Sequence, residues 1–317
     1  MRRVPTRIEL RFAILVVLLA ALVSCPSWAT ETQTDKAPSG RLKLATCQFP
    51  ISADISENAR WIRRQIREAA QKGAHLVHFP ETALSGYASA DHKSLDRLDW
   101  QLLRREMQSI MALAKQNRVW VVLGSTHRLS KGHMPHNSLY LIDDQGQVVD
   151  RYDKRFCTEG DLRHYSPGDH LVVFELNGVK CGQLICHDYR YPELYREYAR
   201  RGVRLLLHSF YNSSKSDKAV RRKLTAEYAQ VYSSMNNMFV SYTNTSRRWS
   251  WPACFTTPDG QIAATLPQNQ PGVMLNEVDV HHKYYDASRR FRPDAIRGKL
   301  NSGQTVDDPR SKDRTAY

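Results

Sequence analysis

Two periods of apolar residues alternate along the chain. Short apolar runs have the length of buried strands, and longer segments between them repeat apolar residues every three or four positions, which is the spacing of one helix face. Ile62, Ile66 and Ala69 show the helical spacing in the segment 56–72. The predicted strands of this alternation are 41–49, 75–79, 119–123, 203–208 and 238–242, and the predicted helices are 56–72, 95–116, 192–201 and 219–235.

Polar turns interrupt the alternation at three places and predict antiparallel hairpins. These turns are 143–146, 176–178 and 258–260, and each contains glycine. The flanking strands are predicted at 138–142 with 148–152, at 171–175 with 180–186, and at 253–257 with 262–266. Two mixed sheets packed face to face, with helices on the outer faces, satisfy both the alternation and the hairpins. We therefore predict an α/β fold built on two mixed sheets.

The ends of the chain follow a different pattern. Four arginines precede an apolar run at 12–23, which leads to Ser27-Trp28-Ala29, an arrangement typical of a signal peptide. The run is shorter than the roughly 20 residues of a membrane-spanning helix. We predict a signal peptide at 1–29, a polar connector at 30–40, one domain at 41–280, and a tail at 281–317 that packs on the surface or on a partner subunit.

The end of the predicted signal peptide is open to two interpretations. Leu22-Val23-Ser24-Cys25 is similar to a bacterial lipobox, in which Cys25 would be lipidated and become the new N-terminus. Alternatively, Cys25 belongs to a segment that is removed after Ala29. Either interpretation places the mature protein outside the cytoplasm, in the periplasm or secreted, and only lipidation attaches it to a membrane.

Charge and cysteine content exclude several classes of partner. The formal net charge is +14, of which residues 30–317 keep +11. Lys and Arg are scattered, without a basic stripe interleaved with aromatic residues, so we expect no nucleic-acid partner. Five cysteines follow residue 29, an odd number without the spacing of metal ligands. We therefore expect neither a disulfide framework nor a bound metal.

Three chemically useful side chains follow apolar runs, where sheets present catalytic groups. They are Glu81 in His78-Phe79-Pro80-Glu81, Lys154 in Tyr152-Asp153-Lys154, and Cys186 in Leu184-Ile185-Cys186-His187-Asp188. A cysteine becomes a nucleophile when a base takes its proton, and a cation then stabilises the negative charge that develops. Glu81, Lys154 and Cys186 are therefore a plausible catalytic set.

These three motifs, together with Ser166-Pro167-Gly168-Asp169 between the last two, resemble the Glu-Lys-Cys triad of the nitrilase superfamily, the carbon–nitrogen hydrolases. The resemblance covers roughly Leu42 to Val280. It implies a four-layer αββα sandwich, no metal or organic cofactor, and assembly as a homodimer or a higher homo-oligomer.

The resemblance also implies a role for each residue. Cys186 would attack a carbonyl carbon, and Glu81 would accept the thiol proton and then protonate the departing amine. Lys154 and the backbone N–H of His187 would stabilise the oxyanion. Many members use a second carboxylate before the Pro-Gly pair, and the matching position here is Asp161, with Glu159 as the alternative.

The residues that follow Cys186 narrow the expected class of substrate. Cys186-His187-Asp188 is similar to the Cys-x-Asp of amidases and carbamoylases rather than to the Cys-Trp-Glu of nitrilases. The expected substrate is therefore a small amide or an N-carbamoyl compound, and Asp188 is expected to hold the local structure. Loops after strands would supply the substrate contacts, which we predict to be Tyr87, Ser209, Tyr211 and Asn212.

Two other functions are compatible with parts of this pattern. The same thioester could be intercepted by an amine, which would make the protein an acyltransferase, although the related lipoprotein acyltransferases resemble multi-span membrane proteins. A catalytically silent, basic binding protein is the other alternative, and the intact triad argues against it. A working site is expected to contain one fast-reacting cysteine of lowered pKa.

Overall fold

The computed structural model describes residues 39–88, 90–212 and 220–315, so the predicted signal peptide and Cys25 lie outside the described residues. The described chain forms two six-stranded sheets. The first has the order β12 (Gly272–Asp279), β1 (Arg41–Gln48), β2 (Leu76–His78), β3 (Trp120–His127), β4 (His136–Ile142) and β5 (Val148–Asp153). The second has the order β11 (Ile262–Thr265), β10 (Cys254–Thr256), β9 (Phe239–Thr243), β8 (Leu205–Ser209), β7 (Val179–Ile185) and β6 (Val173–Leu176).

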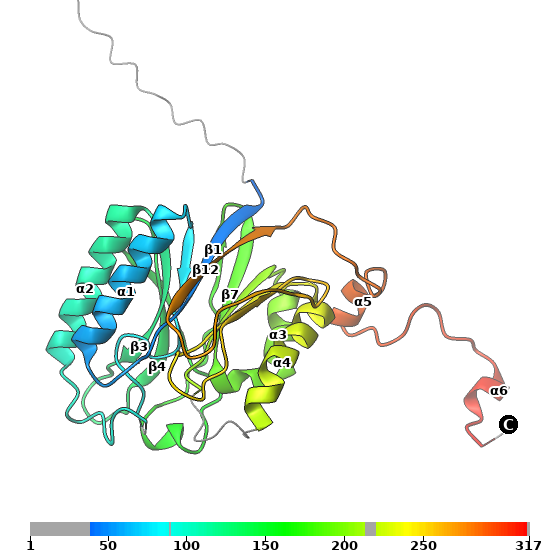
Figure 1. The fold of residues 1–317 in the computed structure, drawn as a ribbon. Coiled ribbons are helices and arrows are strands. Elements are labelled where there is room, and N and C mark those ends of the chain that lie inside the picture. The colour runs from blue at the N-terminus through cyan, green and yellow to red at the C-terminus, as the bar shows by residue number, and fades with distance from the viewer. Residues whose placement is uncertain (1–38, 89, 213–219, 316–317) are drawn as a thin grey trace, which may run out of the picture. The chain divides into compact units, whose positions relative to one another are not determined.

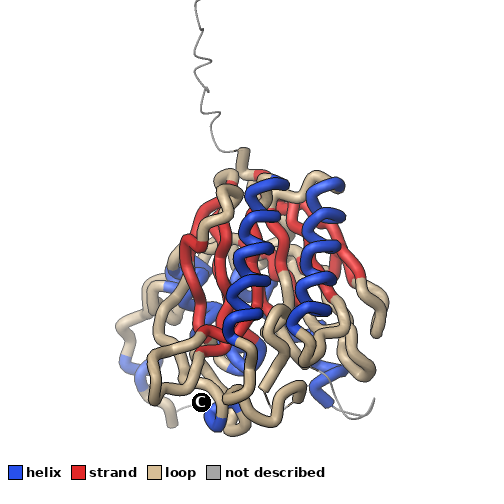
Figure 2. Tube along the Cα trace, turned by 90° about the vertical axis from the view of Figure 1, so that its left-hand side faces the viewer, coloured by secondary structure: helices blue, strands red, loops and turns tan. Residues whose placement is uncertain are grey.

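Helices cover the outer faces of both sheets. The longer helices are α1 (Ile55–Gln71), α2 (Trp100–Asn117), α3 (Pro192–Arg200) and α4 (Val220–Asn236). Short helical segments are η1 (Asp161–Arg163), η2 (Cys186–Arg190), α5 (Arg292–Ile296) and α6 (Pro309–Lys312). Helices α1 and α2 lie side by side on the first sheet, and α3 and α4 lie on the second (Figures 1 and 2). The predicted αββα sandwich is confirmed.

Each sheet is mixed, as the alternation and the hairpins predicted. The strands β1, β2 and β3 are parallel at the centre of the first sheet, and β7, β8 and β9 are parallel at the centre of the second. The neighbours of each central group are antiparallel. Parallel central strands follow from the helical connections between them, whereas short polar turns join the antiparallel edges.

The two faces of the first sheet belong to two different apolar cores, because side chains alternate along each strand. On β1, Leu42 and Leu44 belong to the core that includes strands of the second sheet, whereas Ala45 and Cys47 belong to the core with α1 and α2. Because successive side chains point to opposite faces, one strand supplies both layers.

A buried histidine connects the two sheets by hydrogen bonds. The ring of His78, on β2, contacts the hydroxyl oxygens of Ser241 on β9 at 3.0 Å and of Ser209 on β8 at 2.9 Å. Ser209 also donates to the carbonyl of Phe79 at 2.8 Å. Burial lowers the pKa of His78 to about 3, so the ring is neutral at physiological pH. Both ring nitrogens of His78 therefore have hydrogen-bond partners inside the core.

Three element predictions were incomplete. Helix α2 begins at Trp100 rather than at residue 95, because the side chain of Asp99 accepts a hydrogen bond from the N–H of Leu102 and caps the helix there. Strand β12 was not predicted, and it pairs with the whole of β1. The tail, for which no helix was predicted, contains the short helices α5 and α6.

Gly124 sets how closely β3 approaches the loop that carries Glu81. A Cβ atom at this position would lie 2.0 Å from the carbonyl oxygen of Pro80 and 2.7 Å from the backbone nitrogen of Thr82. Gly124→Ala is therefore expected to lower the free energy of unfolding by about 1–3 kcal/mol, measured by denaturant titration. Gly160→Ala is the control, since its nearest neighbour lies at 3.6 Å. Equal stability of the two variants would contradict this close packing.

Candidate active site

Glu81 follows β2 and is fully buried, with each carboxylate oxygen held by donors. Its Oε1 accepts hydrogen bonds from the side-chain amide of Asn137 at 2.7 Å and from Lys154 Nζ at 2.9 Å, and its Oε2 accepts one from the backbone N–H of Tyr211 at 2.7 Å. Burial raises the pKa of Glu81, although the charge of Lys154 opposes this shift. The carboxylate thus has a fixed orientation and an increased affinity for a proton.

Lys154 follows β5 and contacts two carboxylates. Its Nζ lies 2.9 Å from Oε1 of Glu81 and 2.8 Å from Oδ2 of Asp161, and its side chain has no solvent exposure. Burial alone would lower the pKa of Lys154, but the charge of Glu81 and the other neighbouring groups raise it well above its ordinary value. The side chain is therefore an ammonium cation inside the protein.

Of the two candidates for a second carboxylate, Asp161 contacts Lys154, whereas Glu159 does not line this group. Asp161 begins the turn η1, and besides Lys154 it accepts hydrogen bonds from the hydroxyl of Tyr87 and from the backbone N–H of Thr158. Burial would raise the pKa of Asp161, but Lys154 and these donors lower it, so the carboxylate is ionised. Glu159 is exposed.

Gly168 explains why the Ser-Pro-Gly-Asp motif accompanies Lys154. A Cβ atom at Gly168 would lie 2.6 Å from the carbonyl oxygen of Asp153, and the N–H of Gly168 donates to the carbonyl of Lys154 at 2.9 Å. The motif therefore packs directly against the backbone on both sides of the Asp153–Lys154 peptide bond.

Cys186 lies where β7 ends and η2 begins, and its backbone is in the left-handed region with a φ of 42°. A residue other than glycine in this region is strained by about 1–3 kcal/mol. Hydrogen bonds hold the turn: the ring of His208 contacts the carbonyl of Cys186 at 3.1 Å, and Asp188 accepts from the N–H of Ile185 at 3.0 Å.

Asp188 also connects the turn at Cys186 to the loop after β5 that carries Lys154. Its Oδ1 accepts a hydrogen bond from the N–H of Phe156 at 2.8 Å, and its Oδ2 accepts one from the hydroxyl of Tyr152 at 2.8 Å. Burial raises the pKa of Asp188 to about 6, although these donors oppose the shift. Asp188 holds the local structure, as expected, through hydrogen bonds to both loops.

The pKa of the Cys186 thiol is raised well above its ordinary value, which contradicts the expectation of a lowered pKa. Burial is the largest cause, and the negative charge of Glu81 adds to it. Lys154 lowers the pKa, but its charge is shared with two carboxylates and does not outweigh the other causes. The thiol is therefore protonated before it reacts and needs a base.

A cavity of about 430 Å³ opens above Cys186. Three of the four predicted substrate contacts line it, and the fourth, Ser209, does not, because its side chain is buried between the sheets against His78 and Phe79. The lining residues are Tyr87, Ala90, Thr158, Cys186, His187, Tyr189, Arg190, Tyr211 and Asn212.

Two stacked tyrosines form one wall of this cavity. The rings of Tyr87 and Tyr211 lie 4.9 Å apart and are nearly parallel, at 11°. The hydroxyl of Tyr211 contacts Asp91 at 3.0 Å, and Arg247 donates to both groups. Because Tyr87 donates to Asp161 while the Tyr211 backbone donates to Glu81, this wall also positions both carboxylates.

Asn137, Asp91 and Arg247 were not predicted as site residues. Asn137 is the buried side chain that donates to Glu81, and it stands between the polar residues His136 and Ser138, so the apolar pattern does not mark it. His187 lines the cavity, and its pKa is lowered by burial and then by the charge of Lys154, so its ring is neutral. Within residues 39–88, 90–212 and 220–315, no cluster of three or more His, Cys, Asp or Glu side chains could hold a metal ion.

Comparisons with known proteins agree with this fold. Residues 43–283 match the family model of the carbon–nitrogen hydrolases. The glutamine-dependent NAD(+) synthetase of Acinetobacter baylyi is 25% identical over 252 residues, which cover 77% of this chain and 45% of that protein. The 2-oxoglutaramate amidase of Bacillus subtilis is 32% identical over 169 residues, which cover 52% of this chain and 63% of that protein. The chain thus spans about half the length of these relatives.

A solved structure shows the same fold. It is a variant of the amidase from Nesterenkonia sp. AN1 in which the acetamide moiety of fluoroacetamide is covalently added at the active-site cysteine. The two structures have a TM-score of 0.66 at 20% sequence identity, over 77% of this chain and 93% of that one. At this level of identity the likeness is one of fold.

The charge of Glu81 is expected to control the titration of Cys186. Glu81→Gln removes a negative charge that raises the thiol pKa and leaves Lys154, which lowers it, so the pKa of Cys186 should fall. The measurement is the rate of Cys186 alkylation by iodoacetamide against pH, with the modified peptide identified by mass spectrometry. The midpoint should move to lower pH in Glu81→Gln and stay in place in Glu159→Gln. An unchanged or higher midpoint in Glu81→Gln would contradict the assigned coupling.

Proposed function

Because the chain belongs to the carbon–nitrogen hydrolase family, we propose that it hydrolyses a C–N bond of a small linear amide or N-carbamoyl compound with Cys186 as the nucleophile. The observation that carries this proposal is the buried contact among Glu81, Lys154 and Asp161 beside a cavity lined by Cys186. The amidase activity named for the Bacillus subtilis relative, and the cysteine adduct of the Nesterenkonia amidase, support an amide substrate.

The first step is attack by Cys186. The sulfur forms a bond to the carbonyl carbon of the substrate, the thiol proton moves to Glu81, and the carbonyl electron pair moves onto oxygen. The raised pKa values of the thiol and of the carboxylate favour this arrangement, since a protonated thiol needs a base and Glu81 binds a proton more tightly than an exposed glutamate does.

The developing oxyanion would lie near Lys154 and the backbone N–H of His187. Before the reaction, two carboxylates neutralise the ammonium of Lys154. When Glu81 takes the proton it becomes neutral, so more of the lysine charge is available to the oxyanion. A well-placed donor of this kind contributes about 3–4 kcal/mol to the barrier reduction.

The intermediate then collapses. The carbonyl re-forms, the C–N bond breaks, and the departing amine takes the proton from Glu81, which leaves a thioester on Cys186. A water molecule attacks the thioester carbon and gives a proton to Glu81, and that proton returns to the thiol sulfur as the acid is released. Glu81 is thus the base and the acid in both halves of the reaction.

The cavity limits the substrate to a small molecule. Its volume of about 430 Å³ lies at the lower end of the range for ligand pockets. The stacked rings of Tyr87 and Tyr211 provide an apolar wall, and Asn212 and Arg190, which also line the cavity, provide polar groups. A small acyl group beside the tyrosines is therefore the arrangement that we propose.

The test of the function is ammonia release from simple aliphatic amides, ω-amides and N-carbamoyl amino acids. The wild type should release ammonia from at least one of these classes, and Cys186→Ala should reduce the rate by at least about a thousandfold. Equal rates for the two proteins, or no release from any class by the wild type, would contradict the proposal.

The second carboxylate is tested with a matched pair of amide variants. Asp161→Asn removes one of the two anionic partners of Lys154, so kcat should fall at least about tenfold, whereas Glu159→Gln should change it less than twofold. A larger loss in Glu159→Gln than in Asp161→Asn would reverse the assignment.

We also propose that the protein is exported and forms homodimers. The order of charged, then apolar, then small residues in 1–29 supports export.

Val231 and Met235 support self-association, because both are about half exposed on the outer helix α4, at 47% and 54%. Cell fractionation and the molar mass from light scattering test these two proposals, and a cytoplasmic monomer would contradict both. None of the helices among the described residues is long and apolar enough to cross a membrane.

A further inference from the structure

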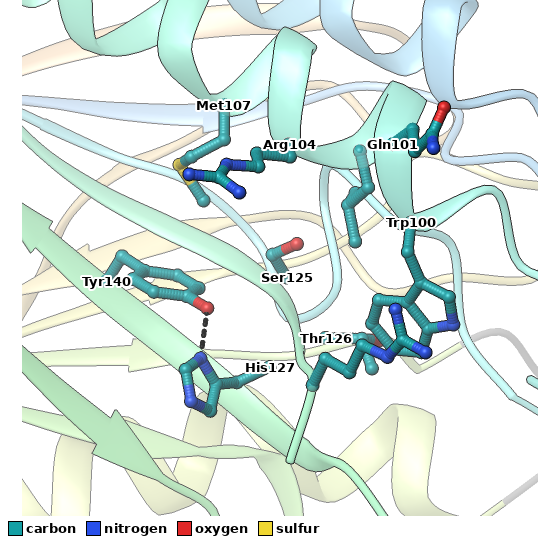
Figure 3. A pocket seen from close by; sticks show the side chains of 10 residues that line it. Trp100, Gln101, Arg104, Met107, Ser125, Thr126, His127 and Tyr140 are labelled. Atoms are coloured by element: carbon teal, nitrogen blue, oxygen red, sulfur yellow. Dashed lines mark hydrogen bonds between the residues drawn. The ribbon is translucent and has the colours of Figure 1, made fainter. Parts of the chain in front are cut away.

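A second hollow, of about 480 Å³, lies where the first turns of α2 face β3 and β4 (Figure 3). It shares no lining residue with the cavity above Cys186. The lining residues are Trp100, Gln101, Leu103, Arg104, Met107, Ser125, Thr126, His127, Arg128 and Tyr140. Its volume is within the range of small-molecule sites.

The walls of this hollow are largely apolar and aromatic. Trp100, Leu103 and Met107 come from α2, and the ring of Tyr140 comes from β4 on the opposite side (Figure 3). Aromatic rings and a thioether make favourable contacts with a flat apolar ligand.

The hydroxyl of Tyr140 has a proton to donate. His127 contacts Arg151 through Nε2 at 3.0 Å and Tyr140 through Nδ1 at 2.6 Å. A guanidinium only donates, so Nε2 accepts, and the proton of the neutral ring lies on Nδ1 and is donated to the Tyr140 oxygen. Burial and then the charge of Arg151 lower the pKa of His127, in agreement with a neutral ring. The O–H of Tyr140 therefore remains available.

Ser125 supplies a second available donor. Its side chain is only 1% exposed, and its hydroxyl has no hydrogen-bond partner. It lies at the centre of the lining residues, between Tyr140 and Trp100 (Figure 3). A buried hydroxyl without a partner costs about 1–3 kcal/mol, and a ligand acceptor in the hollow would remove that cost.

The charged side chains at the hollow have one sign. Arg104 and Arg128 both line it, and no carboxylate among the described residues forms an ion pair with either one. The guanidinium of Arg128 lies over the ring of Trp100, 5.4 Å from its centre, which holds this charge at the rim. None of the ten lining residues is acidic. Asp99, next to Trp100, caps the N-terminus of α2 and offsets the partial positive charge there, so the two arginines are the cationic groups of the hollow.

We propose that this hollow is a second ligand site, which binds a small organic anion whose carboxylate is carried on an aromatic body. The carboxylate accepts hydrogen bonds from Ser125 and Tyr140 and pairs with Arg104 and Arg128, while the aromatic body packs between Trp100, Met107 and the Tyr140 ring. Two hydroxyl donors and two guanidinium groups line the same cavity as the aromatic rings and the thioether, and such a molecule requires both kinds of contact.

The experiment measures binding of 2-naphthoate to the full chain by isothermal titration calorimetry. The wild type should show saturable binding with a Kd below about 1 mM, and 2-naphthylmethanol, which has the same ring without the charge, should bind at least tenfold more weakly. The double variant Arg104→Gln with Arg128→Gln should weaken 2-naphthoate binding at least tenfold, and Ser125→Ala should weaken it severalfold.

Two control variants separate this site from other sources of binding. Arg67→Gln removes one positive charge from an exposed residue of α1, and Arg190→Gln removes one from the cavity above Cys186; both should leave the affinity within twofold. The absence of saturable binding, equal weakening by Arg67→Gln, or weakening by Arg190→Gln in place of the double variant would overturn the proposal. The measurement does not depend on turnover, so it is independent of the hydrolase proposal.

Discussion

The ammonium of Lys154 has no solvent exposure, and the surrounding loops are organised to satisfy its charge. Removing one cation from water costs on the order of several kcal/mol unless anions and hydrogen bonds replace the water. Glu81 and Asp161 provide the anions at 2.9 and 2.8 Å, and their remaining lone pairs accept hydrogen bonds from other buried groups. Two carboxylates and one ammonium leave a net charge of −1, which adds to burial, the largest cause, in raising the pKa of the Cys186 thiol. Transfer of the thiol proton to Glu81 would move the negative charge within the site without changing the total, so no further charge would be buried when the thiolate forms.

The two sheets bring these groups together from distant parts of the sequence. Glu81 and Lys154 follow β2 and β5 of one sheet, whereas Cys186 follows β7 of the other. Their meeting therefore depends on the packing of one sheet on the other, including the buried contacts of His78 with β8 and β9. Glycines at 124 and 168 allow the backbone to approach the loops of Glu81 and Lys154 closely. Cys186, with its left-handed backbone, ends β7 and lines the cavity.

The layers and the three central side chains were predictable because they depend on local patterns: apolar periods, polar turns, and motifs in a particular order. Strand β12 was not predictable in the same way, since it is defined by its pairing with β1, more than 200 positions earlier in the chain. Asn137 contacts Glu81 only because of the strand register, which the apolar pattern does not report. Ser209 was expected at the cavity because it ends an apolar run, but the alternation along β8 directs it between the sheets. The direction of the Cys186 pKa shift depends on the balance of burial, Glu81 and Lys154, and that balance follows from distances rather than from residue types.

The central claim is that Cys186 carries the acyl group of the substrate while Glu81 shuttles the proton. Acid quenching during steady turnover, followed by peptide mass spectrometry, tests it most directly. The account predicts that the peptide containing Cys186 gains the mass of the acyl group, and that Glu81→Gln changes how much of this adduct accumulates. An acyl group on another residue, or continued turnover without any adduct on Cys186 in either protein, would contradict it.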